Sequence, residues 1–552
     1  MECNGQKYAY ESTSRRVPGR KNLVTDKVYL GRVDPETGKI IPKESRRSPA
    51  EIYAKEHGNV VVLDYIQSEL GILDDLKESF PGIGGNTMDA AMSQVIDATS
   101  FNDIHYVVDG SIIREKLKLR GSLSSATMSD LSEDIGTSLS SMDDFFSRRI
   151  KRSSSGFYSL DLKFVSSYSN MNGWAGWGHN RDEEDLKQTN IAMVTGGDGI
   201  PVMFRMLPGS IADISVMKCM VEDMICMGCN GCLVMDRGFE SAANINALLE
   251  MGVEFTVPSN AKAEPIKKLM SQAITDMKES SAHRYHEGRA YKTAEYDLGI
   301  VQTDGSYEYV VRVPQNHKGS KENNERFEGS RKLRAFVVYD PKKASDDLNS
   351  VISMVAEIEL KYENTKHDDP DKVYQALPAF IRKYVTFNAD TEGYVHVERK
   401  QNSFTLAGNR AGMFVMLASE GTSWDLMMSS YDVRDWVEKA FDIYKNDIDS
   451  SRSRTGDPDR ARGRFFIKFI ALILRIHIQN AIRNHDKDIL RTKAKKDSVN
   501  GKTVNEIVRT LNSLMAVGNT GDWKLTAVSK NVREIFAFFG LEEPKSGRII
   551  IG

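Results

Sequence analysis

The chain has 552 residues, long enough for about three or four domains with ample buried core. Its 74 lysines and arginines nearly balance 77 aspartates and glutamates, so net charge alone predicts no polyanionic partner. Five cysteines argue against a disulfide scaffold and favour a reducing cytoplasm, and the first residues lack the apolar core of a signal peptide.

Residues 1–48 are predicted to form a basic arm and a hairpin. They carry eleven Lys/Arg against six Asp/Glu, and two short apolar runs flank the turn sequence DPETGK. Four cations could reach a DNA backbone, although a solvated terminus explains them equally well. These cations are Arg15, Arg16, Arg20 and Lys21.

Residues 49–152 show apolar spacings of three and four, which predict a helical domain. The segment SPAEIYAKEHG predicts a helix, with a serine N-cap, a proline in the first turn and a closing glycine. A small helical bundle could place one helix in a major groove and bind DNA ends. An ordinary packing domain remains an open alternative.

Residues 153–260 change to the pattern of an α/β domain. FYSLDLKFVSSYS alternates like a strand, IAMVTGGDGIPVMFRML predicts a hairpin, and CLVMD and VEFTVPS are further strands between helices. Three antiparallel strands followed by helix, strand, helix and strand is the order of an RNase H-like sheet, although the periodicity by itself predicts only an α/β domain. Asp161 lies on the first strand and Asp236 at the carboxyl end of the fourth, where such sheets usually form sites.

Residues 261–424 are predicted to be a β-rich insertion, since they are too long for a loop. The core resumes over 425–495, and 496–552 is predicted to be a helical tail. FFIKFIALILRI (465–476) is too short to span a bilayer and is interrupted by charges, so it predicts a core helix. Residues 451–497 carry thirteen Lys/Arg against five Asp/Glu, which could contact phosphates or form a solvated face.

The segment YDVRDWVEKAFDIYK (431–445) predicts an amphipathic helix. At 100° per residue, Tyr431, Arg434, Glu438 and Lys445 fall within one sector of about 60°, opposite an apolar arc. A solvated helix face is the ordinary explanation of such a sector. The fixed spacing Y-x2-R-x3-E-x6-K, however, resembles the signature of the insertion-sequence-four superfamily of DDE transposases.

Other segments are similar to the same superfamily, close to its IS-sixteen-thirty-four subgroup. They are GHNRDEEDLKQTN (178–190), DGIPVMFRMLPGSIAD (198–213) and VMDRGFES (234–241). Two departures stand out: Leu162 and Lys163 follow the first aspartate, where small hydroxyl residues are common, and Ser210 replaces the usual asparagine of the turn.

Phosphodiester cleavage by divalent ions needs a few hard oxygen ligands that leave room for substrate. Two aspartates from strand ends and one glutamate from a helix meet that need, so Asp161, Asp236 and Glu438 are the predicted catalytic residues and metal ligands. The predicted cofactor is two Mg²⁺ or Mn²⁺ ions. Clustered carboxylates repel one another, which is a physical reason to expect cations between them.

The resemblance implies that Tyr431, Arg434 and Lys445 contact transposon-end DNA, and Arg237 could steer phosphate or pair with an acid. Asp442 is a rival ligand on the same helix face, outside the signature. The implied partners are double-stranded DNA, as terminal inverted repeats and target, and a second copy in a homodimer on DNA. We expect a cytoplasmic, nucleoid-associated prokaryotic enzyme that needs no membrane.

Two alternatives stay open: another RNase H-like nuclease, and a catalytically inactive DNA-binding descendant of a transposase. The spacing of Cys226, Cys229 and Cys232, with Cys219 nearby, could hold a metal but is better explained by core packing. His283 and His286 are interpreted as exposed polar residues. Phe414 and Trp424 both lie near the place where the resemblance expects a base-stacking aromatic residue, which stays unassigned.

Overall fold

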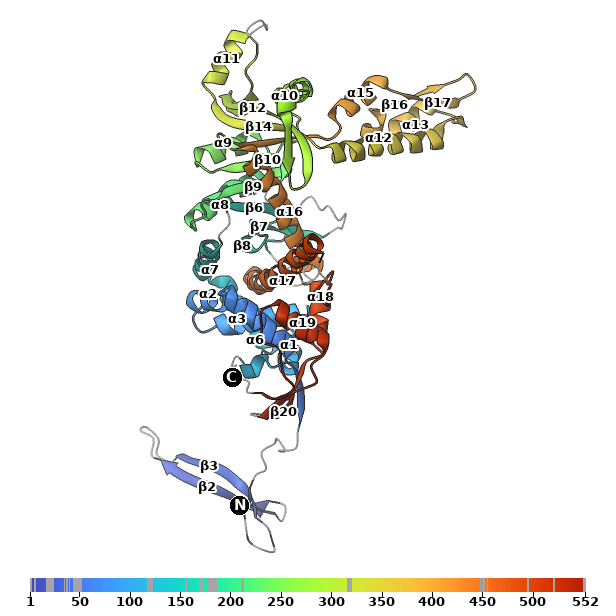
Figure 1. Ribbon diagram of the computed structural model, residues 1–552. Coiled ribbons are helices and arrows are strands. Elements are labelled where there is room, and N and C mark those ends of the chain that lie inside the picture. The colour runs from blue at the N-terminus through green and yellow to red at the C-terminus, as the bar shows by residue number, and fades with distance from the viewer. Residues whose placement is uncertain are drawn as a thin grey trace. The chain divides into compact units, whose positions relative to one another are not determined.

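The computed structural model divides the chain into two compact units (Figure 1). One comprises Met1–Tyr65, Tyr106–Arg120 and Ile489–Gly552, and the other Ile66–His105 and Gly121–Asp488. The structure describes residues 2–3, 6–15, 24–33, 35, 38, 40–42, 52–116, 123–153, 156–167, 173–176, 186–209, 213–314, 320–446, 448, 452–453, 455–493, 496–519 and 522–549. Arg16, Arg20, Lys21, residues 178–185 and Ser210 lie outside these ranges.

The second unit is built on a large mixed sheet. Its central strands are β6 (Phe157–Ser167), β7 (Lys187–Gly196), β8 (Pro201–Pro208), β9 (Cys232–Met235) and β10 (Phe255–Pro258). In space they run β10-β9-β6-β7-β8, with β6, β7 and β8 antiparallel and β9 parallel to both β6 and β10. The predicted α/β class with an RNase H-like strand order is confirmed.

Strands of the expected insertion continue this same sheet. β18 (Met413–Ser419) pairs antiparallel with β10, and β14, β12 and β11 follow outward, with β13 paired to β12. Without β18, the outer edge of β10 would leave backbone groups unpaired, so the added strands satisfy it. Their bounds are β11 (His283–His286), β12 (Arg289–Thr303), β13 (Ser306–Val310) and β14 (Arg331–Tyr339). The domain boundaries at 261 and 424 stay predictions.

A smaller sheet lies between β14 and β18 in the chain. Its strands β15, β17 and β16 have their own apolar core, which includes Val355, Ile358 and Val385. The elements are α12 (Pro341–Tyr362), β15 (Thr365–Lys366), α13 (Pro370–Ala376), α14 (Ala379–Arg382), β16 (Val385–Ala389), β17 (Tyr394–Arg399) and α15 (Gln401–Arg410). A 71-residue stretch of chain, 341–411, thus leaves and re-enters the large sheet at neighbouring strands.

Helices cover the large sheet, and the longest, α17 (Pro458–Thr492), forms its aromatic core. Phe466 and Phe469 pack against Phe145, Phe146 and Phe204 with ring centroids 5.1–6.5 Å apart. α17 is long and apolar enough to cross a membrane, yet 72% of its most apolar window is buried inside the protein, as a core helix requires. The other helices here are α7 (Leu139–Arg152), α8 (Asp213–Cys226), α9 (Ala242–Glu250), α10 (Glu264–Asp276), α11 (Ser320–Glu328) and α16 (Trp424–Asn446).

The first unit joins segments from both ends of the chain. Strand β5 (Tyr53–Glu56) pairs with β20 of the tail, in a sheet of order β22-β21-β20-β5. The helix predicted for SPAEIYAKEHG is therefore wrong over this segment, because the edge of β20 offers backbone partners that outweigh local propensity. The tail contains α18 (Val504–Leu511), β20 (Met515–Asn519), β21 (Asp522–Leu525), α19 (Lys530–Phe538) and β22 (Gly547–Ile549).

The remaining elements complete the two units. A separate four-stranded sheet near the N-terminus has the order β1-β2-β3-β4. Its strands are β1 (Glu2–Cys3), β2 (Gln6–Arg15), β3 (Val24–Val33) and β4 (Ile40–Pro42). The helices are α1 (Gly58–Glu69), α2 (Ile72–Ser79), α3 (Gly84–Ile96), α4 (Ile104–Gly110), α5 (Ile113–Lys116) and α6 (Ser125–Thr137).

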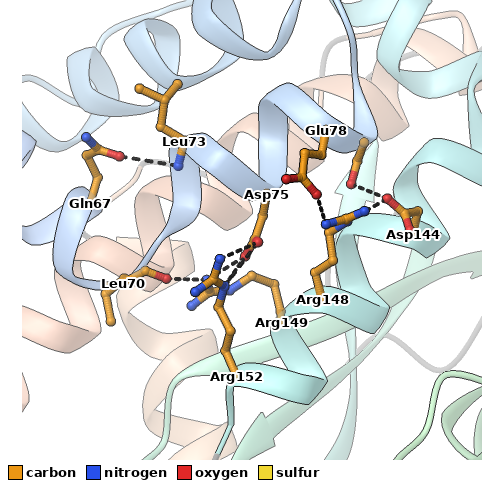
Figure 2. A network of polar contacts seen from close by, with 10 residues as sticks. Gln67, Leu70, Leu73, Asp75, Glu78, Asp144, Arg148, Arg149 and Arg152 are labelled. Atoms are coloured by element: carbon orange, nitrogen blue, oxygen red, sulfur yellow. Dashed lines mark hydrogen bonds and ion pairs between the residues drawn. The ribbon is translucent and has the colours of Figure 1, made fainter.

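The basic end of α7 is bound to acids of α2, as Figure 2 shows. Buried Asp75 accepts hydrogen bonds from Arg149 at 3.0 Å and from Arg152 at 2.9 Å, and Arg149 also donates to the Leu70 carbonyl. Arg148 pairs with Glu78 and Asp144. In the basic block 451–497, Arg460 likewise pairs with Glu133 at 2.7 Å. These cations fasten helices together, so their local charge is not evidence for a DNA surface.

Candidate active site

The two predicted aspartates lie side by side at the centre of the sheet. Leu160 on β6 is in register with Met235 on the parallel strand β9, so the next residues, Asp161 and Asp236, are neighbours where β9 ends. Because opposite residues of paired strands point to the same face, both carboxylates leave the sheet on one side. The charge of Asp236 accordingly contributes to raising the pKa of Asp161.

Asp161 is buried, with 5% of its surface exposed. Its Oδ1 accepts a hydrogen bond from the Leu162 amide at 2.7 Å. Its Oδ2 lies 3.2 Å from Lys163 Nζ as an ion pair, yet it has no hydrogen-bond partner among the described residues. Burial raises the pKa of Asp161 to about 6 against the attraction of Lys163. A buried carboxylate beside a second carboxylate fits Mg²⁺ or Mn²⁺, which prefer oxygen ligands.

Helix α16 packs across β6, β7, β9 and β10 and carries the predicted signature. A buried hydrogen bond of 2.7 Å between Thr256 on β10 and Ser430 anchors it to the sheet. Arg434 is half-buried and lies 5.0 Å from the ring centroid of Tyr431. Burial alone would lower the pKa of Arg434, but the Asp435 hydrogen bond and nearby negative charge, including that of Asp236, raise it overall. The structure thus brings Asp161, Asp236 and Arg434 together.

The other predicted residues follow along the same helix. Glu438 is exposed, one turn after Arg434. Lys445 Nζ lies 4.7 Å from the ring centroid of Phe164, three residues beyond Asp161 on β6. Within the described ranges, no group of three His, Cys, Asp or Glu side chains is close enough to hold a metal ion, so Glu438 stands apart from the aspartate pair. Arg237 is exposed in the turn after Asp236.

Aromatic residues near the signature have defined neighbours. Phe414 stacks on Tyr431 at 5.0 Å and 20° between ring planes. Trp424 is buried in a core that includes Met427 and Tyr291. The Phe414 stack and the Thr256–Ser430 bond could not be found from sequence, because each joins segments that only the sheet brings together.

The hairpin turn predicted at DGIP (198–201) packs closely against α16. Gly199 has φ +80°, and a Cβ at this position would lie 2.7 Å from the ring of Trp436. The Asp198 carbonyl accepts a hydrogen bond of 2.6 Å from Asn480 on α17. The glycine is therefore required both for the turn and for close approach of the signature helix.

We expect Gly199→Ala to lower the free energy of unfolding by about 2–4 kcal/mol, since it adds a clash to positive-φ strain. Gly252→Ala is the matched control, because Gly252 also has positive φ (68°) but its Cβ would meet nothing within 4 Å. Urea unfolding measures both variants. Equal losses of unfolding free energy in Gly199→Ala and Gly252→Ala would show that the clash with Trp436 adds nothing to the strain of the turn.

We expect Asp161→Asn to stabilise the metal-free protein by about 2 kcal/mol, because it removes a buried charge and keeps the Leu162 hydrogen bond. The same change should reduce the rise in melting temperature that Mn²⁺ causes in the wild type. Thermal unfolding with and without Mn²⁺ tests both. A destabilised variant would contradict the assigned cost of burying Asp161.

The cysteines and histidines have other surroundings. Burial raises the pKa of Cys229 to about 11 and that of Cys232 to about 12, so both thiols are neutral at physiological pH. Cys219 and Cys226 are exposed. His283 is exposed, whereas His286 lies 2.6 Å from Asp432 on α16 and so joins β11 to the signature helix.

Comparison with known proteins gives one family. The family model described as "Transposase DDE domain" matches residues 143–474, more than half of the chain. The matched segment runs from α7 into α17 and contains Asp161, Asp236 and Glu438. None of the curated proteins compared with the chain matches it.

Proposed function

The chain belongs to the transposase DDE domain family, and on this premise we propose that it cuts DNA at the ends of a mobile element and joins those ends to target DNA. The observation that carries the proposal is the pairing of Asp161 with Asp236 on one face of the sheet, beside Arg434. Two acids next to a cation suit a reaction in which phosphate must be held close to metal ligands.

Asp161 and Asp236 would hold the divalent ions, with Glu438 completing the set from α16. Glu438 is exposed, and its carboxylate lies at the end of a flexible side chain. The carboxylate can therefore move toward Asp161 and Asp236 when bound cations offset the repulsion among the three acids. Such ions, when bound, lower the pKa of the attacking hydroxyl and stabilise the leaving oxygen. Until cations bind, the ion pair with Lys163 partly offsets the negative charge of Asp161.

The other signature residues would bind and orient DNA. Arg434 is held by Tyr431 and Asp435, so its guanidinium has little freedom to lose when it binds a phosphate. Lys445 lies near the far part of β6 and would contact the backbone further along. Tyr431 can donate a hydrogen bond to the same strand, and Arg237, exposed in the turn after Asp236, can contact phosphate.

Two DNA ends must be cut and joined together, so we propose a symmetric homodimer assembled on double-stranded DNA, with terminal inverted repeats and target as substrates. The element's own terminal repeats, with Mn²⁺ or Mg²⁺, test the proposal. Cleavage and joining at these ends are expected. Cleavage of unrelated branched or RNA-containing duplexes without joining would favour a nuclease, and binding without any nicking would favour an inactive descendant.

A further inference from the structure

Lys163 is held against Asp161 by an ion pair. The two residues are two positions apart on β6 and therefore point to the same face of the sheet. Lys163 Nζ lies 3.2 Å from Asp161 Oδ2, while the Leu162 amide donates a hydrogen bond of 2.7 Å to Oδ1. Both oxygens of this carboxylate thus face a positive partner in the metal-free protein, although we propose that the same carboxylate binds divalent ions.

An ammonium group and a divalent ion repel each other when both lie against Asp161 Oδ2. A divalent ion such as Mg²⁺ binds a carboxylate oxygen at about 2 Å, so it would lie at most about 5 Å from Lys163 Nζ in its present position. Water screens this repulsion only weakly, because Asp161 is buried. Lys163 must therefore leave Oδ2 when an ion binds there.

Lys163 has more freedom to move than its partner. Its side chain is 24% exposed, against 7% for Asp161, and a flexible four-carbon stem joins its ammonium to the backbone. Strand β9 pairs with β6 only as far as Leu160, and β19 (Arg452–Ser453) pairs with β6 from Ser166. Lys163 lies between these two segments, at a break in the strand pairing that the structure describes, beside the carboxyl end of β9.

The charges of the site determine which partner the released ammonium would find. In the metal-free protein two carboxylates, Asp161 and Asp236, are balanced by two cations, Lys163 and Arg434. Two divalent ions would add four positive charges, of which Glu438 offsets one. The loaded site would therefore carry excess positive charge, and the phosphates of a DNA substrate are the anions that compensate it.

We propose that Lys163 exchanges partners: it pairs with Asp161 in the metal-free protein and binds a DNA phosphate once divalent ions occupy the carboxylates. This inference rests on the proposed function and names a residue through which metal binding and DNA binding assist each other. Each binding event favours the release of Lys163 from Asp161, so the two events are coupled, and such coupling is reciprocal. An ion pair that only stabilises the strand would couple nothing.

Mn²⁺ binding to the full chain without DNA tests the first half of the exchange, with free Mn²⁺ measured by electron paramagnetic resonance. Lys163→Met and Lys163→Gln should bind Mn²⁺ about three- to tenfold more tightly than the wild type, since no ammonium competes. Lys163→Arg keeps the charge and should bind like the wild type. Lys187→Met is the matched control, because Lys187 is a half-buried lysine of β7 in register with Ser167, six positions beyond Asp161. Unchanged Mn²⁺ affinity in both Lys163→Met and Lys163→Gln overturns the exchange.

Equilibrium DNA binding tests the second half. The probe is terminal-repeat DNA that is already cut at the element's end, offered without target DNA. Without metal, Lys163→Met should bind like the wild type, because Asp161 then holds Lys163. With saturating Mn²⁺, it should bind about three- to tenfold more weakly, and the slope of log Kd against log salt should be smaller by about 0.9. Equal losses with and without Mn²⁺, or no loss in either condition, overturn the exchange.

Failure of the exchange and failure of the proposed function give different results. If Asp161→Asn binds Mn²⁺ as tightly as the wild type, Asp161 is not a ligand and both proposals are wrong. If Asp161→Asn weakens Mn²⁺ binding but the Lys163 variants behave like the wild type, the metal site stands and only the exchange is wrong. Circular dichroism checks that the variants fold, and Lys163→Gln replaces Lys163→Met in the DNA assay if the methionine variant does not.

Discussion

Asp236→Asn and Glu438→Gln are each expected to reduce cleavage of terminal-repeat DNA by about a thousandfold or more while leaving DNA affinity nearly unchanged. Each change removes one charged oxygen ligand and keeps the shape of the side chain. The phosphate contacts that set affinity come from other residues, namely Arg434, Lys445 and Tyr431 in the proposed site. Single-turnover cleavage with Mn²⁺ and equilibrium binding without metal measure the two effects separately.

Asp442→Asn is the control for Glu438→Gln. Asp442 is also exposed on α16, one turn further along, and shares the helix face without belonging to the signature. We expect its cleavage rate to fall by less than about threefold. Equal losses at Asp442 and Glu438 would mean that the helix contributes general negative charge, and full activity of Glu438→Gln would refute its role as a ligand.

Asp75→Ala should lower the free energy of unfolding by about 3–5 kcal/mol, because breaking a buried ion pair leaves its partner charged without compensation. The Asp75 side chain is 2% exposed and that of Arg149 6% exposed, so water cannot replace the lost hydrogen bonds. Burial already lowers the pKa of Arg149, against the hydrogen bond and charge of Asp75. Chemical denaturation of the full chain measures the loss.

Glu78→Ala provides the comparison on the same helix. Glu78 pairs with Arg148, but the two side chains are 60% and 33% exposed, and an exposed pair is worth about 0–1 kcal/mol. The large difference expected between the two variants comes from burial and not from the number of contacts. Similar losses for both would show that the Asp75 network contributes no more than a surface pair.

The sequence by itself determined the central elements of the large sheet. The alternation around Asp161, the DGIP turn, the short apolar strand before Asp236 and the period of 431–445 are local signals, and each yields the predicted strand, turn or helix. These local signals suffice to predict the RNase H-like strand order, because short strands that alternate with helices can pair in only a few ways. The spacing of the signature also marked the helix that faces the aspartates.

Only the tertiary structure decided which side chains meet. The pairing of β5 with β20 joins residues more than 450 positions apart and overrides local helix propensity, which no local pattern can reveal. The same holds for Asp75 and Arg149, which are 74 positions apart and meet only because α2 packs against α7. Register between β6 and β9 set Asp161 beside Asp236, whereas Glu438 is exposed on α16. Which side chains lie close together depends on packing across the whole sheet, whereas the periodicity of a helix or strand depends only on residues near one another in the chain.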